Sequence, residues 1–206
     1  MNTEDLEATL ASPAATDAET LQRLHARLEA DAAREDVLDI SYRTLDTPLG
    51  TLLLASTRHG LVRVAYEIED HDRVLETLAM KVSPRILKSP RRLDDTAREL
   101  DEYFAGRRTA FDVPLDFALA RGFRRSVLDH LPEIGYGHTE SYAQVAQATG
   151  SPRAVRAVGT ACATNPLPLV VPCHRVVRSD GSYGQYAGGA EAKRVLLTME
   201  ASLRAG

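Results

Sequence analysis

The sequence predicts an α+β protein in which a small antiparallel sheet with helices precedes a mainly helical second half. Two observations lead to this fold class. Between residues 40 and 66, apolar and polar side chains alternate and turn-forming residues interrupt the pattern twice, which is typical of short antiparallel strands. Between residues 123 and 163, apolar side chains instead recur at spacings of three and four, which favours amphipathic helices.

The composition argues against several classes of protein. The chain has 206 residues, of which 44% are hydrophobic and 26% charged, close to globular averages and long enough for one or two domains. No apolar run approaches the roughly 20 residues that span a bilayer, and the N-terminus lacks the features of a signal peptide. We therefore expect a cytoplasmic protein with no membrane partner, whose Cys162 and Cys173 are reduced.

The net charge of −4 is unevenly distributed. Residues 1–39 carry −7, residues 40–120 carry −1 and residues 121–206 carry +4. A basic segment is typical of a surface that docks on nucleic acid, although ordinary scatter explains +4 over that length equally well. Charge and pattern together predict three segments. These are an acidic N-terminal extension, partly disordered or helical, at 1–38, a first domain at 39–120 and a second domain at 121–206.

The first two segments contain the following expected elements. The Ala-rich, acidic stretch to about Thr16 predicts disorder, and the leucines at 21, 24 and 28 predict a helix. Strands are expected at 40–44, 51–56, 61–66 and 111–117, and helices at about 70–82 and 93–105, with the basic, Pro-containing segment 83–92 between these two helices. The first three strands would form an antiparallel meander.

Three helices are expected in the second domain, at about 123–131, 141–148 and 152–163. Gly135 to Gly137 would end the first. Thr139 or Ser141 can cap the second, and Ser151 with Pro152 would begin the third. The last two helices, joined by a turn that contains glycine, fit a helix-turn-helix. Spacing alone also fits a plain helical hairpin, and favours it.

The third helix of this domain combines two arginines with an otherwise small face. Arg153 and Arg156 project from a surface of small residues, namely Ala154, Ala157, Gly159 and Ala161. Small side chains allow a helix to lie close to another backbone, which fits DNA docking and helix packing alike.

The strongest chemical candidate is Cys173. Three prolines within residues 166–172 predict a rigid, extended approach to it. Thiolate is the nucleophilic form of cysteine, and the neighbouring His174 and Arg175 would lower its pKa. Neighbouring side chains of an extended chain point to opposite sides, so His174 would reach the thiol through a bridging water. Glu200 is the candidate to fix the imidazole tautomer.

A Cys-His pair alone is more often a buried cysteine beside an incidental histidine. We assign Cys162 to packing. The remaining histidines show no ligand spacing, so no metal site is expected.

The run Pro172 to Val177 resembles the active-site motif of the O6-alkylguanine-DNA alkyltransferases, also called methylated-DNA–protein-cysteine methyltransferases. Further segments resemble that family in the same order, namely 141–142, 153–159, 165–168, 184–186, 188–189 and 193–200. Residues 42–66 resemble the family's first domain more weakly. The resemblance implies a ribonuclease-H-like α/β first domain with a small antiparallel sheet, and a helical second domain with a winged helix-turn-helix.

The resemblance also implies the chemistry of the site. Cys173 would accept the alkyl group from the guanine oxygen by an SN2 displacement, once per molecule. His174 would deprotonate Cys173 through water, Glu200 would orient the imidazole, and Asn165 would brace the active-site turn. No cofactor and no metal are implied.

Base flipping, which exposes the target atom, is implied as well. Tyr142 would crowd the target phosphate and hydrogen-bond the flipped base, while Arg156 would fill the vacated place. The helix-turn-helix would enter the minor groove, which is read almost without regard to sequence. The other residues expected to contact DNA or the base are Arg153, Ala154, Gly159, Val176, Tyr186 and Ala187.

Double-stranded DNA containing O6-alkylguanine is the implied partner, with O4-alkylthymine as a further expected lesion. Ala187 stands where some relatives have serine, so the preferred lesion stays open. We expect a monomer in solution and leave cooperative assembly on DNA open. The alternatives are a lesion binder that does not react and a helix-turn-helix regulator.

Overall fold

The computed structural model describes residues 13–34 and 37–204. Contacts divide the chain into two compact units, 1–38 and 39–206, and each is described by itself. The first unit contains α2 (Pro13–Arg34). This helix confirms the prediction from the leucine spacing, and Leu21, Leu24 and Leu28 are each more than half exposed along it. Disorder was expected as far as Thr16, but α2 already begins at Pro13; residues 1–12 lie outside the described residues.

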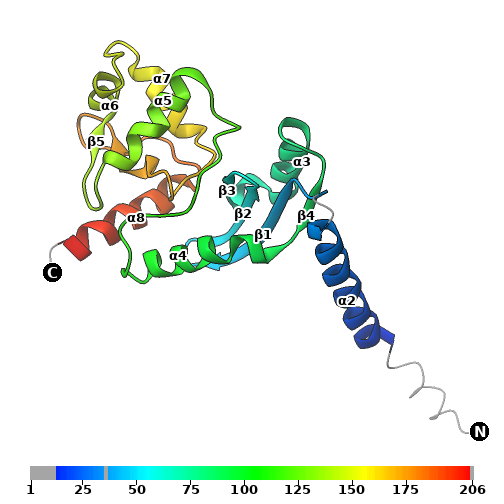
Figure 1. The fold of residues 1–206 in the computed structure, drawn as a ribbon. Helices are drawn as coiled ribbons and strands as arrows, with labels where there is room; N and C mark the ends of the chain where they lie inside the picture. The colour runs from blue at the N-terminus through cyan, green and yellow to red at the C-terminus, as the bar shows by residue number, and fades with distance from the viewer. Residues whose placement is uncertain (1–12, 35–36, 205–206) are drawn as a thin grey trace, which may run out of the picture. The chain divides into compact units, whose positions relative to one another are not determined.

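A four-stranded sheet organises the first half of the second unit (Figure 1). Its order is β3-β2-β1-β4, formed by β1 (Ile40–Thr47), β2 (Gly50–Thr57), β3 (Gly60–Tyr66) and β4 (Ile86–Lys88). The first three strands are antiparallel, as predicted, whereas β4 is parallel to β1. The sequence does not reveal β4, because three residues beside a proline are too few for an alternating pattern.

Each face of the sheet packs against one helix. On one face, Leu53 and Val62 form a core with Val74 and Leu78 of α3 (His71–Lys81). On the other face, β2 and β3 pack with α4 (Asp94–Phe104), which follows the 3₁₀ helix η2 (Pro90–Leu93). The two helices expected at 70–82 and 93–105 are therefore confirmed. Alternation along the strands places apolar residues on both faces, so the sheet is a buried middle layer.

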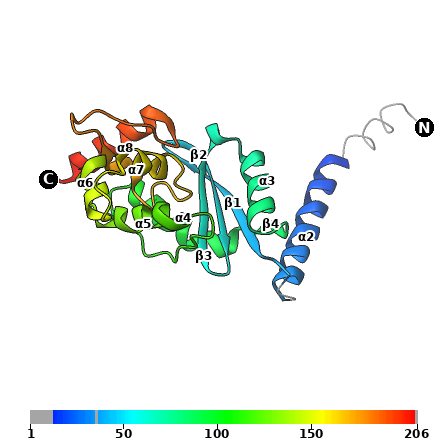
Figure 2. The same ribbon diagram turned by 90° about the horizontal axis from the view of Figure 1, so that it is seen from above.

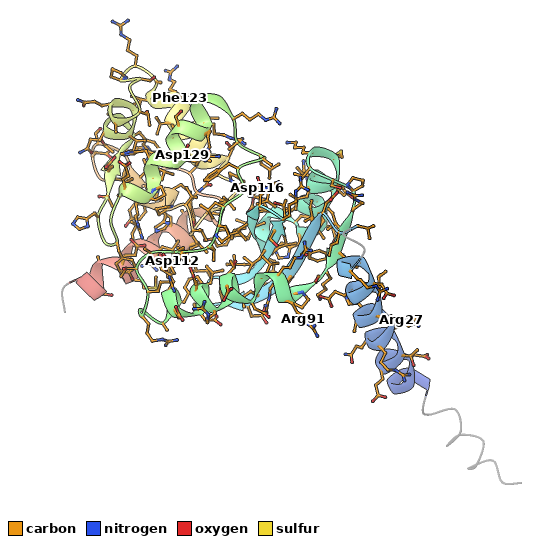
Figure 3. All side chains as sticks on the ribbon, viewed as in Figure 1. Arg27, Arg91, Asp112, Asp116, Phe123 and Asp129 are labelled. Carbon is orange, nitrogen blue, oxygen red and sulfur yellow. The ribbon has the colours of Figure 1, made fainter. Side chains whose placement is uncertain are left out.

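The strand expected at 111–117 is wrong. That segment makes only one bridge to the sheet, between Leu61 and Leu115. The Leu61 N–H donates to the Pro114 oxygen (2.8 Å), but Pro114 has no N–H to extend a ladder. At Gly60, whose φ is +135°, an added Cβ would lie 2.3 Å from that oxygen, so this close approach requires glycine. Figure 3 labels Asp112 and Asp116 on this connection.

The second half of the unit is mainly helical. It consists of α5 (Gly122–His130), 3₁₀ helix η3 (Leu131–Glu133), α6 (Tyr142–Ala148), α7 (Val155–Ala163) and α8 (Gly189–Arg204), with the short parallel pair β5 (Glu140–Ser141) and β6 (Val176–Val177). Helices α5, α6 and α7 gather in both views (Figures 1 and 2). Ser141 caps α6 as predicted, because its hydroxyl accepts the Gln144 N–H while the Gln144 side chain accepts the Ser141 N–H.

The predicted start of the third helix is wrong by three residues. α7 begins at Val155 with Ala154 as its N-cap, so Ser151 and Pro152 precede the helix. The Ser151 N–H donates to the Ala146 oxygen, and the Gly150 N–H donates to the Gln147 oxygen. These two bonds form the Schellman motif that ends α6. Ser151 therefore belongs to the end of one helix, and Arg153 lies in the turn.

The predicted fold class is confirmed, since a sheet with two helices precedes a helical half that contains a helix-turn-helix, α6 and α7. In the part of the chain that the structure describes, no helix is long and apolar enough to cross a membrane.

Candidate active site

The segment before Cys173 is a tight turn. We call residues 165–172 the active-site turn. The extended approach predicted from its prolines is wrong, because the Val171 N–H donates back to the Leu167 oxygen (2.8 Å) and Leu169 adopts a φ of +73°. Cys173 itself begins the 3₁₀ helix η4 (Cys173–Arg175). The prolines exclude an α-helix but not a sequence of turns.

A single buried amide holds this turn together. Asn165 is 1% exposed. Its Oδ1 accepts the Leu167 N–H (2.9 Å), and its Nδ2 donates to the Val171 oxygen (2.8 Å) and to the Cys173 Sγ (3.1 Å). Because these bonds join the start of the turn to its end, Asn165 both bends the chain and fixes the sulfur.

The sulfur of Cys173 is a neutral thiol in the resting protein. Its residue is 1% exposed. Burial raises the pKa of Cys173 to about 11, although the bond from Asn165 and the charge of Lys193 oppose that rise. The expectation that His174 and Arg175 lower this pKa is not met, because both side chains are engaged by Glu200. The thiol proton must therefore leave during any reaction.

His174 is arranged to receive a proton. Its Nε2 lies 2.9 Å from Oε1 of Glu200, and both side chains are fully buried. A carboxylate only accepts hydrogen bonds, so Nε2 carries the ring proton and Nδ1 keeps its lone pair. Nδ1 has no hydrogen-bond partner among the described residues. Burial lowers the pKa of His174 although the bond to Glu200 opposes this, which leaves the imidazole neutral.

Glu200 lies at the centre of a saturated network. Arg175 donates to both carboxylate oxygens (2.9 Å each), the Tyr103 hydroxyl donates at 2.7 Å and the Gly137 N–H at 3.1 Å. Burial by itself would raise the pKa of Glu200, but the bonds from His174 and Arg175 outweigh it and lower the pKa to about 2. Sequence reasoning missed Tyr103 at this site, because Tyr103 lies 97 positions from Glu200 and no local pattern connects the two.

The loop that precedes α8 contains one tyrosine of the site and contacts another. We call residues 183–188 the tyrosine loop. Tyr186 is 8% exposed, and its ring lies 6.1 Å from that of His174 in an edge-on arrangement. Tyr142 is the first residue of α6, and burial raises its pKa to about 12. A Cβ at Gly184 would lie 2.1 Å from the Tyr142 hydroxyl, so only glycine allows this contact.

A cavity of about 440 Å³ lies beside this loop. Its walls come from the end of α7, the residue after β6, the tyrosine loop and the start of α8. They comprise Ala163, Arg178, Tyr183, Gly184, Gln185, Tyr186, Gly189 and Ala190. Tyr186 thus lines the cavity and also faces His174, whereas Cys173 does not line it.

The remaining predicted residues lie in three places. Arg153 lies in the turn before α7 and Arg156 in its first turn; both are exposed, and their side chains form no ion pair among residues 13–34 and 37–204. At Gly159 an added Cβ would meet nothing within 4 Å, so the small face is open. Ala154 caps α7 and Ala187 lies in the tyrosine loop. Val176 is buried in β6, where its oxygen accepts from the buried Lys193 (2.6 Å).

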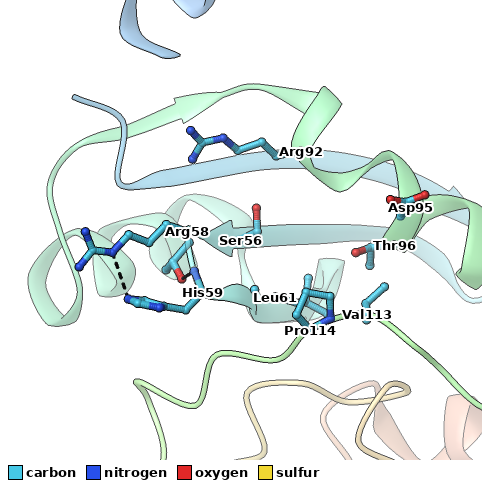
Figure 4. Close-up of a pocket in the computed structure, with 11 residues that line it drawn as sticks. Ser56, Arg58, His59, Leu61, Arg92, Asp95, Thr96, Val113 and Pro114 are labelled. Atoms are coloured by element: carbon cyan, nitrogen blue, oxygen red, sulfur yellow. Dashed lines mark hydrogen bonds between the residues drawn. The ribbon is translucent and has the colours of Figure 1, made fainter. Parts of the chain in front are cut away.

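A second cavity, of about 520 Å³, lies beside the four-stranded sheet (Figure 4). Arg58, His59 and Arg92 line it together with Ser56, whose buried hydroxyl has no partner among the described residues. It contains no cysteine. Nowhere in the described ranges do three His, Cys, Asp or Glu side chains gather so that they could hold a metal ion. The cluster around Cys173 is thus the better candidate for group transfer.

Comparison with known proteins identifies relatives of both halves. Residues 40–117 match the family model of the 6-O-methylguanine DNA methyltransferase ribonuclease-like domain, and residues 122–202 match that of the DNA-binding domain. A methylated-DNA–protein-cysteine methyltransferase of Mycobacterium tuberculosis is 39% identical over 79% of this chain and 93% of its own length. The constitutive one of Bacillus subtilis is 40% identical over 77% and 94%.

A solved structure is similar as well. The crystal structure of Mycobacterium tuberculosis OGT in complex with DNA superposes with a TM-score of 0.67, at 37% identity, over 79% of this chain and 94% of that one.

Proposed function

Since the chain belongs to the methylated-DNA–protein-cysteine methyltransferases, a family of DNA alkyl-repair enzymes, we propose that it transfers the alkyl group of O6-alkylguanine in DNA to Cys173. The family and the enzyme class expected from the sequence are confirmed. Our proposal covers the acceptor residue, the lesion, the single reaction per molecule and the extrusion of the base from the duplex.

The observation that carries this proposal is that a thiol and a neighbouring imidazole, which can accept its proton, are both held in place by hydrogen bonds. Asn165 holds the Cys173 sulfur at 3.1 Å, and the ionised Glu200 holds the neutral His174 at 2.9 Å. A nucleophile, a base and a group that orients the base are the parts that nucleophilic catalysis requires.

The proposed step balances as follows. Sγ of Cys173 attacks the alkyl carbon, a carbon–sulfur bond forms and the carbon–oxygen bond to guanine breaks. The thiol proton passes to Nδ1 of His174 through a water, and the guanine leaves with the electron pair of the broken bond and takes up a proton. The network around Glu200 favours the transient imidazolium, since an ionised carboxylate stabilises the charged ring. A thioether is a poor leaving group, so each molecule reacts once.

DNA binding is assigned to the helix-turn-helix. Its two unpaired arginines, Arg153 and Arg156, and the open small face at Gly159 suit a narrow groove. We propose that Arg156 fills the place of the extruded base, and that Tyr142 and Tyr186 contact that base, with the Ala187 N–H facing its oxygen. Because Cys173 is 1% exposed, the side chains that cover its sulfur must move before a base can reach it. A relative solved in complex with DNA supports DNA as the partner.

Mass spectrometry tests the acceptor directly. After incubation with duplex DNA containing O6-methylguanine, the peptide that carries Cys173 should gain the mass of one methyl group, in at most one copy per protein. Cys173→Ala should abolish the gain. The matched control, Cys162→Ala, should retain it, since Cys162 lies buried in α7. Full transfer by Cys173→Ala would overturn the proposal.

Base extrusion has its own test. Arg156→Ala should react with free O6-benzylguanine at the wild-type rate but should be slowed at least tenfold, roughly the cost of one lost base-flipping contact, on duplex DNA. Equal losses on both substrates would assign Arg156 to structure instead.

One alternative has an observation in its favour. The low exposure of Cys173 and its pKa of about 11 also fit a protein that binds the lesion without reacting. Tight lesion binding by the reduced protein, with no change in mass, would support that function.

A further inference from the structure

Strand β3 of the sheet domain contacts the active-site turn. The Val64 N–H donates to the Pro166 oxygen (2.9 Å), and Nη1 of Arg63 lies 3.3 Å from the same oxygen and 3.5 Å from that of Asn165. The backbone that carries the Asn165 amide is therefore fixed by the first domain as well as by its own turn.

The last residue of β3 contacts the other side of the site. Tyr66 and Tyr186 share a hydrogen bond between their hydroxyls (2.8 Å), and their rings are edge-on with centroids 5.7 Å apart. Tyr66 is 2% and Tyr186 8% exposed. No other described side chain bonds the Tyr186 hydroxyl, so the position of that hydroxyl depends on Tyr66.

The tyrosine loop lies directly against the Tyr66 ring. A Cβ added at Gly188 would come within 2.7 Å of that ring, closer than any side chain can approach. The loop is thus held by a backbone contact at Gly188 and by a hydroxyl contact at Tyr186.

Tyr66 is itself anchored. Its N–H donates to Oε1 of Glu69 (2.9 Å), and the other oxygen of Glu69 forms an ion pair with Arg63. The ring therefore projects from a fixed point of the sheet domain, and it can transmit that position to the loop.

We propose that Tyr66 is a positioning residue whose hydroxyl orients Tyr186, and with it the tyrosine loop, for binding the alkylated base. This inference rests on the proposed function, in which Tyr186 contacts the base. It gives the first domain a role in base recognition, although every residue assigned to DNA, base or transfer lies in the second domain.

The hydroxyl is separable from the ring. Tyr66→Phe keeps the ring against Gly188 and removes only the bond to Tyr186. Leaving the buried Tyr186 hydroxyl without a hydrogen bond costs free energy, so the Tyr186 ring should reorient towards another partner. Binding of the base should suffer, while the distance between Cys173 and His174 should not change.

Single-turnover kinetics with free O6-benzylguanine test this separation. Tyr66→Phe should raise the half-saturating concentration about tenfold, the effect of one lost hydrogen bond. The limiting rate and the fraction of protein that reacts should stay near wild type. Tyr42→Phe, in β1 of the same sheet, is the matched control and should change neither. A purely structural role would lower the reactive fraction and leave the half-saturating concentration unchanged.

A double-mutant cycle completes the test. If the two hydroxyls act as a pair, Tyr66→Phe should add little to the effect of Tyr186→Phe. Effects that multiply, or a Tyr66→Phe variant that behaves like Tyr42→Phe, would overturn the inference. These outcomes presuppose that wild type reacts, so a wild-type protein that gains no alkyl group would instead refute the proposed function.

Discussion

The two sides of η4 differ in the ionisation of their acidic groups. On one side, the Cys173 sulfur accepts a hydrogen bond from the neutral amide of Asn165, and burial keeps it protonated. On the other side, Glu200 receives Arg175, Tyr103 and His174 and stays ionised at a pKa of about 2. The difference teaches that the resting site holds a thiol and not a thiolate. An ionised carboxylate supports a neutral imidazole, and the thiol can transfer its proton to that imidazole when an alkylated nucleobase binds.

The largest effect on stability should come from removing the negative charge of Glu200. Glu200→Gln keeps the shape but leaves the Arg175 guanidinium, 5% exposed, without its counter-charge. Breaking a buried ion pair in this way costs about 3–5 kcal/mol. Urea denaturation should therefore show a large loss in the free energy of unfolding, and alkyl transfer should be lost with it.

The control lies on the same helix. Glu191 pairs with Arg194 at the exposed start of α8, so Glu191→Gln should leave the free energy of unfolding nearly unchanged. If the two variants lost the same free energy of unfolding, the buried network would stabilise the protein no more than an exposed ion pair does.

The two sides should also fail at opposite ends of the pH range. The pKa of Glu200 falls from 4.5 to about 2 on folding, so its contribution is present above pH 4.5 and is lost as the pH falls towards 2. The pKa of Cys173 rises from 9.0 to about 11, so stability is lost as the pH rises from 9 towards 11. Each change amounts to about 3 kcal/mol.

Denaturation curves across pH can separate these groups. Glu200→Gln should flatten only the acid limb, and Cys173→Ser only the alkaline limb. An alkaline limb that persists unchanged in Cys173→Ser would show that the thiol is not the group kept protonated by burial.

Asn165 should have an intermediate effect, confined to the neutral side. Asn165→Ala leaves the Leu167 N–H buried without its partner, whereas the Val171 oxygen keeps the bond from the Cys173 N–H. The unpaired N–H should cost about 2 kcal/mol. It also removes a donor that lowers the pKa of Cys173, so modification of the thiol by iodoacetamide should require a higher pH. A thiol that reacts at lower pH in this variant would contradict the geometry, unless the turn has opened, which hydrogen exchange at Val171 would report.

Local signals were interpreted well from the sequence, and non-local ones were not. Ser141 and Gln144 form a capping box within four residues, so their pattern is visible. Ser151 has the same chemistry, but its N–H is used by the preceding helix. The side chain of Asn165 bends a proline-rich segment that reads as extended. Within the site, His174 and Glu200 were proposed from the sequence itself and the family resemblance added Asn165. No pattern links Tyr66 or Tyr103 to residues about a hundred positions away.

The smallest effect should come from the edge of the charged side. Tyr103 and Tyr136 have rings 6.0 Å apart, but only the Tyr103 hydroxyl bonds Glu200, while the buried Tyr136 hydroxyl has no partner among the described residues. Tyr103→Phe should lower the free energy of unfolding by about 1 kcal/mol, since other donors still satisfy the carboxylate. Tyr136→Phe should leave it unchanged or raise it slightly, because a buried, unpaired hydroxyl is removed. Thermal denaturation of the two variants side by side measures the difference. The reverse order would show that ring packing, and not the bond to Glu200, decides the contribution of Tyr103.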